Sequence, residues 1–186
     1  MAVAVSVLAG CAQLAPEQDD GSRLLQAILP PESLGRQLAL SQEVVGEFQD
    51  QTQSLRVEVE ITPKRLAMVG LTHMGVPVFS LEQDADGIEV EALGAATLPF
   101  NPKHILSDFQ IAFWPATVLE GKLQSLGLGF QEVATGDSRK VLGESGEVLV
   151  QVTYLDRASS TGDIIINHFD HPYRLYIKTI EASGSW

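Results

Sequence analysis

The body of the chain consists of short runs in which apolar and polar residues alternate. Leu55, Val57, Val59 and Ile61 alternate with charged residues, which is the pattern of a strand with one buried and one solvated face. The segments between such runs are rich in Gly, Pro, Asp and Ser, as turns are. Short strands at this spacing predict an antiparallel meander that curls into a sandwich or barrel. The other expected strands are residues 65–72, 76–83, 87–93, 147–155, 163–169 and 173–180, with weaker candidates at 35–48, 129–133 and 140–142.

Two stretches have helical periodicity instead. Residues 22–29 carry apolar side chains at helical spacing, with Ser22 as the expected N-cap and a pair of prolines as the stop. Residues 101–125 combine an Asn101 N-cap, a proline at the first helical position and an apolar stripe, and Pro115 is expected to divide them into two helices. A large antiparallel sheet with a helical cover across its apolar face predicts an α+β fold.

The helical cover and the curved sheet supply candidates for a ligand cavity. A helix lying over a strongly curved sheet tends to enclose a cavity when the barrel is wide or open. The same side chains also suit a filled core, and the pattern leaves both interpretations open. The expected lining is Leu106, Phe109, Phe113, Trp114, Val57 and Val59.

One predicted turn is apolar. Met74 and Val76 flank Gly75 and Pro77, which suit a tight reversal between two strands. An apolar tip that protrudes and contacts membrane or cargo is one interpretation, because exposed apolar patches usually have a function. The other is that Met74 folds back onto the core, since Met readily fills gaps.

The charge balance narrows the classes of partner. The chain has 12 Lys plus Arg against 24 Asp plus Glu, a formal net charge of −12. Without a basic run to follow a phosphate backbone, we expect no nucleic acid partner. The same charge disfavours adsorption to anionic lipid, so membrane attachment would require apolar insertion or a covalent lipid. The acidic residues Glu58, Glu60, Glu89 and Glu91 fall on the solvated faces of predicted strands.

The sequence carries no strong catalytic, metal or cofactor motif. His168-x-x-His171 with Asp170 is the tightest cluster of potential metal ligands, but zinc sites usually need further ligands at recognisable spacing. Ser145 lies in Gly-Glu-Ser-Gly, and Glu147 stands where a nucleophile elbow requires a second glycine. Phosphate-binding glycine motifs are also missing. We therefore expect a protein that is not an enzyme and holds neither a metal nor a cofactor.

The first residues suggest export. Residues 1–10 are apolar except for Ser6 and precede the chain's single cysteine, Cys11. They are too short to span a membrane, which takes roughly 20 residues, but they match the apolar core of a secretory signal. We expect residues 1–10 to be a signal remnant, 11–22 a flexible tether and 23–186 one domain, with the natural start upstream. The alternative is a buried strand that ends in a core cysteine.

Residues 8–11, Leu-Ala-Gly-Cys, resemble the lipobox of bacterial lipoproteins. The resemblance implies that the thiol of Cys11 carries diacylglycerol, that the chain is cut before it and that the new amine is acylated. Ala12 stands where an aspartate would signal inner-membrane retention in many enteric lipoproteins. The resemblance thus implies a lipid anchor in the outer membrane, with the domain facing the periplasm.

The domain resembles an uncharacterised group of predicted lipoproteins that are often encoded beside aryl polyene genes. The similarity spans residues 35–180 and rests on Arg65-Leu66-Ala67, Gly70-Leu71-Thr72, the helix through Trp114-Pro115, Gly162 and a Tyr-x-Leu-x-Ile pattern at 173–177.

In element order the group is similar to the outer-membrane acceptor of the Lol lipoprotein-sorting pathway. This implies a strongly curved antiparallel sheet or half-open β-barrel with a helical lid. The implied function is to bind an acyl chain, a lipidated protein or a polyene lipid for transfer or export, with residues 74–77 in the place of the acceptor's exposed apolar loop. The alternative is a non-catalytic structural or assembly lipoprotein of the cell envelope.

Overall fold

The structure is a computed structural model that describes residues 19–48, 51–93, 100–156, 162–170 and 173–184. Cys11, the signal remnant and most of the tether lie outside the described residues. In the described part, ten strands form one antiparallel sheet in the order β5-β4-β3-β2-β1-β10-β9-β8-β7-β6. The strands are β1 Leu38–Phe48, β2 Gln51–Thr62, β3 Arg65–Leu71, β4 Pro77–Gln83, β5 Ile88–Ala92, β6 Gly129–Glu132, β7 Ser138–Leu142, β8 Val148–Tyr154, β9 Ile164–His168 and β10 Tyr173–Gly184.

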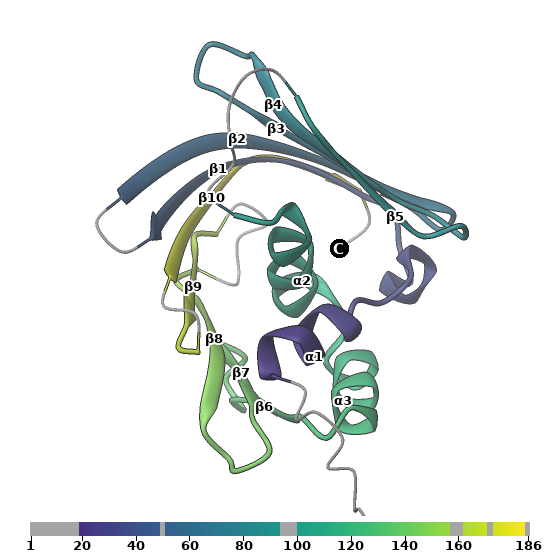
Figure 1. The fold of residues 1–186 in the computed structure, drawn as a ribbon, viewed down its shortest axis with the longest axis vertical. Coiled ribbons are helices and arrows are strands. Elements are labelled where there is room, and N and C mark those ends of the chain that lie inside the picture. The colour runs from purple at the N-terminus through teal and green to yellow at the C-terminus, as the bar shows by residue number, and fades with distance from the viewer. Residues whose placement is uncertain (1–18, 49–50, 94–99, 157–161, 171–172, 185–186) are drawn as a thin grey trace, which may run out of the picture.

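The sheet is strongly curved and does not close (Figure 1). β1 to β5 form one meander and β6 to β10 form another, and the pairing of β1 with β10 joins them. Figure 1 shows the helices on the concave side. The predicted α+β fold, with a curved antiparallel sheet and a helical cover, is confirmed.

Alternation along each strand sorts side chains to the two faces of the sheet. Val57, Val59 and Ile61 are buried on the concave face, whereas Glu60 is exposed on the convex face. At one position the packing requires glycine, because a Cβ on Gly70 would overlap the ring of Phe79 on the neighbouring strand. The period-2 pattern of the sequence therefore assigns the inward face correctly.

The helices are α1 (Asp20–Gln26), the short 3-10 helix η1 (Pro31–Leu34), α2 (Pro102–Phe113) and α3 (Ala116–Ser125). The side chain of Asn101 caps α2 by accepting a hydrogen bond from the backbone N–H of Lys103 at 3.0 Å, and Pro115 separates α2 from α3. Among the described helices, none is both long enough and apolar enough to cross a bilayer.

The first helix corrects one prediction. Asp19, not Ser22, is the N-cap of α1, and its carboxylate accepts a hydrogen bond from the N–H of Ser22 at 2.7 Å. The helix begins at Asp20, so residues 20–22 belong to it rather than to the tether. Both side chains can cap a helix, and with the N-cap at Asp19 the helix buries Gly21 and Leu24.

Candidate functional site

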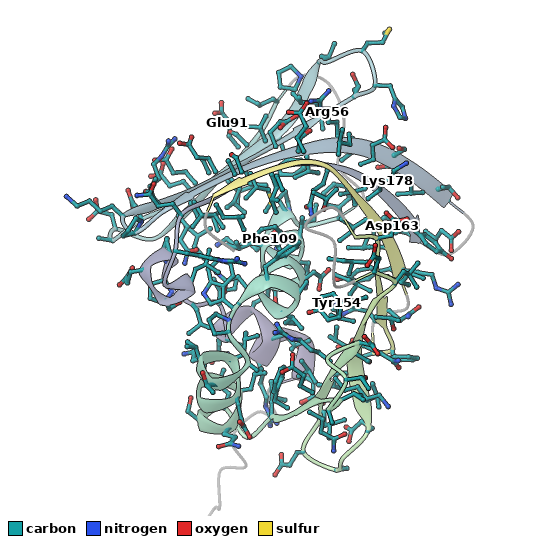
Figure 2. The ribbon with its side chains drawn as sticks, turned by 180° about the vertical axis from the view of Figure 1, so that it is seen from behind. Arg56, Glu91, Phe109, Tyr154, Asp163 and Lys178 are labelled. Carbon is teal, nitrogen blue, oxygen red and sulfur yellow. The ribbon has the colours of Figure 1, made fainter. Side chains whose placement is uncertain are left out.

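Helix α2 lies beneath the concave face and brings most of the predicted cavity residues together. Leu106, Phe109 and Trp114 from the α2 segment join Val57 and Val59 of β2 in one core, and each of these five residues is 0–3% exposed. In Figure 2, Phe109 lies between α2 and the sheet. The structure thus places these residues in a tightly packed apolar layer.

The sixth predicted residue, Phe113, is half-buried at the end of α2. Its ring stacks on Phe109 with centroids 4.5 Å apart, and Phe109 meets Trp114 edge-on at 6.2 Å. The three aromatic rings therefore form a continuous cluster along α2.

A buried polar cluster ties α2 to the C-terminal meander. Asp108 of α2 lies against His168 at the end of β9, with Oδ1 and Nε2 2.5 Å apart, and its Oδ2 accepts a hydrogen bond from the Tyr173 hydroxyl at 2.7 Å. The rings of His168 and Tyr173 stack with centroids 4.1 Å apart. Nδ1 of His168 lies 3.8 Å from Asp170. A carboxylate buried in α2 thus has partners on β9 and β10.

The electrostatics of this cluster favour a charged imidazole. Burial lowers the pKa of His168, but the charge and hydrogen bond of Asp108, with Asp170 adding to them, outweigh burial and raise the pKa to about 9. Burial and the nearby carboxylate also raise the pKa of Tyr173, so its phenol stays protonated. At neutral pH the cluster is therefore a buried ion pair that also accepts a phenol hydrogen bond.

A second buried cation closes the C-terminal end of α2. Nη1 of Arg139 on β7 donates to the carbonyl oxygens of Ile111, Ala112 and Trp114 at 2.9, 3.2 and 2.8 Å. Its Nε donates to Glu132 at 2.8 Å. The last carbonyls of a helix have no partner within the helix and carry partial negative charge, so a guanidinium suits this position.

The N-terminal segment is fastened to the other side of α2. Gln110 accepts a hydrogen bond from the backbone N–H of Leu29 at 2.7 Å and donates to its carbonyl oxygen at 2.8 Å, while Gln83 of β4 donates to the same oxygen at 2.9 Å. Nε1 of Trp114 donates to Ser33 at 2.7 Å. Polar side chains thus hold α2 at both flanks, whereas apolar side chains face the sheet.

Towards β5 the concave face becomes open. Direct cross-strand pairs form the row Val59, Met68, Leu81 and Val90 on one face of β2 to β5. The first three are 0–3% exposed, while Val90 is 37% exposed. The apolar layer therefore extends from beneath α2 to an accessible strand.

The apolar turn between β3 and β4 protrudes into solvent. Met74 is 87% exposed and Val76 is 53% exposed. The turn is closed by backbone hydrogen bonds from Gly75 to Thr72 and from Thr72 to Val76. Neither side chain folds back onto the core.

Because both side chains face solvent, replacing Met74 and Val76 together with Glu should change the free energy of unfolding by less than about 1 kcal/mol. Any contact of this turn with membrane or cargo should be weakened by the two charges. Urea unfolding and liposome flotation of the variant measure the two effects. A large loss of stability with unchanged flotation would mean that the turn is structural.

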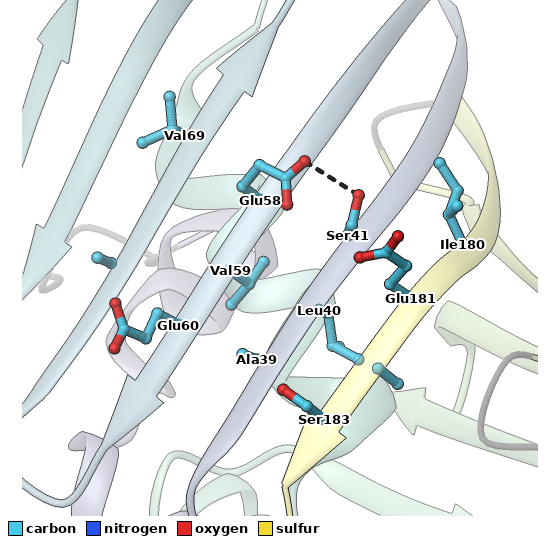
Figure 3. A pocket seen from close by; sticks show the side chains of 12 residues that line it. Ala39, Leu40, Ser41, Glu58, Val59, Glu60, Val69, Ile180, Glu181 and Ser183 are labelled. Atoms are coloured by element: carbon cyan, nitrogen blue, oxygen red, sulfur yellow. Dashed lines mark hydrogen bonds between the residues drawn. The ribbon is translucent and has the colours of Figure 1, made fainter.

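A hollow of about 700 Å³ lies on the convex face, opposite α2 (Figure 3). Its lining includes Ala39 and Ala67 together with Glu58, Glu60 and Glu181. Val59 of the predicted cavity also borders this hollow, together with Leu40 and Val69. The other predicted cavity residues, Leu106, Phe109, Phe113, Trp114 and Val57, do not line it.

The comparisons assign the chain to a family. One family model, described as a protein of unknown function (DUF3261), matches residues 39–181. The chain belongs to this family. Among curated proteins no similar sequence is found.

Three solved structures are similar to this DUF3261 protein at very low sequence identity. A LolA superfamily protein from Nitrosomonas europaea is 6% identical with a TM-score of 0.45, over 87% of this chain and 92% of that one. A putative outer membrane lipoprotein-sorting protein domain from Vibrio parahaemolyticus is 5% identical with a TM-score of 0.44, over 80% and 85%. A DUF1329 family protein from Desulfovibrio piger is 6% identical with a TM-score of 0.41, over 87% and 90%.

Of the polar residues that hold α2 in this DUF3261 protein, the sequence patterns included His168 and Asp170 as potential metal ligands and Tyr173 in the Tyr-x-Leu-x-Ile pattern, but they predicted no contact with α2. His168 was weighed as a metal ligand with His171, which lies outside the described residues. Among the residues that the structure describes, no group of three or more His, Cys, Asp or Glu side chains could hold a metal ion. The sequence carries no clear signal for Asp108, because helix α2 also carries Lys103, His104, Ser107 and Gln110 outside its apolar stripe.

Proposed function

We propose that this protein is a non-catalytic lipoprotein of the bacterial outer membrane, facing the periplasm, that binds an acyl chain or a lipidated protein against its concave face. The observation that carries the proposal is the apolar row from Val59 to Val90, which starts beneath α2 and ends on an accessible strand. An alkyl chain would gain about 0.8 kcal/mol for each methylene that it buries, less the cost of displacing the side chains that cover Val59, Met68 and Leu81. A polyene lipid would use the same contacts.

The geometry of α2 supports this function. Its polar attachments are at its flanks and its C-terminal end, through Gln110, Asp108 and Arg139. The contact between Phe109 and the sheet is apolar, so it can separate without leaving a buried polar group unpaired. An acyl chain that enters from the β5 side would extend between these layers towards Leu106, Phe113 and Trp114.

Binding of a fluorescent fatty acid to the full chain tests the proposal. Val90→Asp should weaken saturable binding at least about tenfold, because the carboxylate would have to lose water where the alkyl chain lies. Glu91→Gln is the matched control, since Glu91 is exposed on the opposite face of the same strand. Equal binding by Val90→Asp and Glu91→Gln would contradict the proposed site.

One observation favours a second function, that of a structural or assembly lipoprotein. Leu106, Phe109 and Trp114 are nearly inaccessible, as in a filled core. A protein of this kind would show no saturable binding of the fatty acid, and it would retain its fold and its membrane attachment.

The lipid anchor is tested at Cys11, whose thiol is the proposed attachment point. Cys11→Ser should abolish membrane attachment and leave the domain folded, because a stable anchor requires acyl chains and the described residues from Leu24 onward form a hydrophobic core among themselves. Cell fractionation with immunoblotting measures attachment, and circular dichroism of the purified variant measures folding. Retention of the serine variant in the outer membrane would contradict the anchor.

A further inference from the structure

The edge strand β5 has an outer side that no described strand pairs with. It pairs with β4 through the residue pairs from Phe79 with Ala92 to Gln83 with Ile88, and it ends the order of the sheet. An unpaired edge of this kind is a template for a further strand.

The backbone register shows which groups of β5 face outward. The N–H of Asp84 donates to the carbonyl oxygen of Gly87, and the N–H of Leu93 donates to that of Val78. In an antiparallel pair, hydrogen-bonded and non-hydrogen-bonded residue pairs alternate, so every second residue from Gly87 to Leu93 is hydrogen-bonded to β4. Glu89 and Glu91 therefore direct their backbone groups towards β4. Ile88, Val90 and Ala92 direct theirs to the outer side of the strand.

The side chains of β5 differ sharply between its two faces. Ile88, Val90 and Ala92 share the concave face with Leu81, whereas Glu89 and Glu91 are exposed on the convex face. Figure 2 shows Glu91 on the outer side of the sheet. A strand that pairs here must therefore present apolar side chains on the concave face, and on the convex face side chains that suit the two glutamates.

The convex face of β5 carries an excess of negative charge. Glu89 lies directly opposite Glu82, and like charges in this position are destabilising. Arg65 binds Glu82 through two hydrogen bonds of 2.5 and 2.7 Å, and the described residues show no ion pair for Glu89 or Glu91. A cation beside these glutamates would balance the excess of negative charge.

We propose that the outer edge of β5 docks an extended polypeptide segment in which apolar residues alternate with Lys or Arg, added as a further antiparallel strand. Its apolar side chains continue the row that ends at Val90, and its cations face Glu89 and Glu91. A second copy of this chain does not fit, because antiparallel pairing centred on Val90 places Glu89 opposite Glu91, and each chain carries a net charge of −12. The edge thus rejects self-pairing and selects a basic partner.

The test uses the full chain and a fluorescent peptide of about ten residues, the length of a long strand, in which Lys and Val alternate. A peptide of the same composition with its lysines in one block and its valines in another is the control ligand. Fluorescence anisotropy gives the affinities. We expect saturable binding of the alternating peptide, at least about tenfold tighter than that of the block peptide.

Two variants separate strand addition from attraction to a negative surface. Val90→Pro removes one outward backbone N–H and leaves the ladder to β4 intact, since proline is tolerated on edge strands. The double change Glu89→Lys with Glu91→Lys reverses the charge of the edge. Each should weaken binding of the alternating peptide at least about tenfold.

The matched control is Glu60→Lys with Glu181→Lys, which makes the same change of net charge on the convex face away from β5. It should bind the peptide almost as the natural chain does. Equal binding of both peptides, an unaffected Val90→Pro variant, or equal losses in the two lysine doubles would overturn the proposal. The doubles leave the apolar row intact and should bind the fatty acid normally, so this proposal and the proposed function can fail separately.

Discussion

Asp108→Asn should lower the free energy of unfolding by about 3 kcal/mol at neutral pH, because His168 loses the anion that keeps it protonated and the buried ion pair is broken. In the native protein Asp108 is 2.5 Å from Nε2 of His168 and accepts the Tyr173 hydroxyl, and the side chains of Asp108 and His168 are almost fully buried. Asparagine preserves the shape of the side chain, so the loss reports the charge. Asp163→Asn, which makes the same change on an exposed residue of this meander, is the matched control.

The same substitution should remove a pH dependence. The pKa of His168 is raised from 6.5 to about 9 in the folded state. The imidazolium therefore contributes stability that is complete below pH 6.5 and is lost as pH rises through about 9. That pKa difference corresponds to about 3 kcal/mol.

Urea unfolding of the natural chain, of Asp108→Asn and of Asp163→Asn across this pH interval measures the effect. The natural chain and Asp163→Asn should lose stability as pH rises, while Asp108→Asn should show a nearly flat profile. A natural chain whose stability does not fall would show that His168 is neutral in the fold and that the cluster is held by hydrogen bonds alone.

Local patterns predict much of the fold because most of its elements are defined within a few residues. Val57, Val59 and Ile61 alternate with charges, so their strand and its buried face follow from sequence. Asn101 and Pro115 mark the start of α2 and its separation from α3 in the same way. The N-cap at Asp19 was missed because Asp19, Asp20 and Ser22 all have side chains that can cap a helix.

Local sequence patterns do not predict which distant strands pair with each other. β1 pairs with β10 from Leu38 with Gly184 to Phe48 with Tyr173, and a bulge near Ser41 lets the two strands remain paired over their length. Periodicity identifies both strands and says nothing of their partnership. β10 accordingly continues to Gly184, past the predicted end at Ile180.

In the candidate site too, local patterns predict the helix but not its long-range contacts. An apolar stripe containing Phe109 and Phe113 predicts a buried helix face, whether that face borders a cavity or a filled core. The polar side chains on the flanks of α2 are identified only in three dimensions, since the partners of Asp108 and Arg139 lie far away in the sequence. Buried polar groups need partners, but the burial of Asp108 becomes known only from the structure, since α2 also carries Lys103, His104, Ser107 and Gln110.

Arg139→Met should lower the free energy of unfolding by about 3 kcal/mol or more, because it removes three hydrogen bonds to buried carbonyl oxygens and the ion pair with Glu132. The guanidinium contacts three carbonyl oxygens at the end of α2 and is only 5% exposed. Methionine fills much of the same volume, so the loss reports the polar contacts rather than a cavity.

Lys140→Met is the matched control, since Lys140 lies next to Arg139 on β7 and points to the opposite face of the sheet. It should change the free energy of unfolding by less than about 0.5 kcal/mol, as ordinary surface substitutions do. Arg139→Lys should recover only part of the loss, because an ammonium cannot reproduce a planar guanidinium that donates to several oxygens at once. Urea unfolding gives the stabilities, and hydrogen exchange of the amides in the last turn of α2 shows whether the helix end frays. Equal stability of the two methionine variants would mean that the C-terminal end of α2 is held by apolar packing around Trp114 and by the hydroxyl of Tyr154, which donates to Ala112 at 2.6 Å.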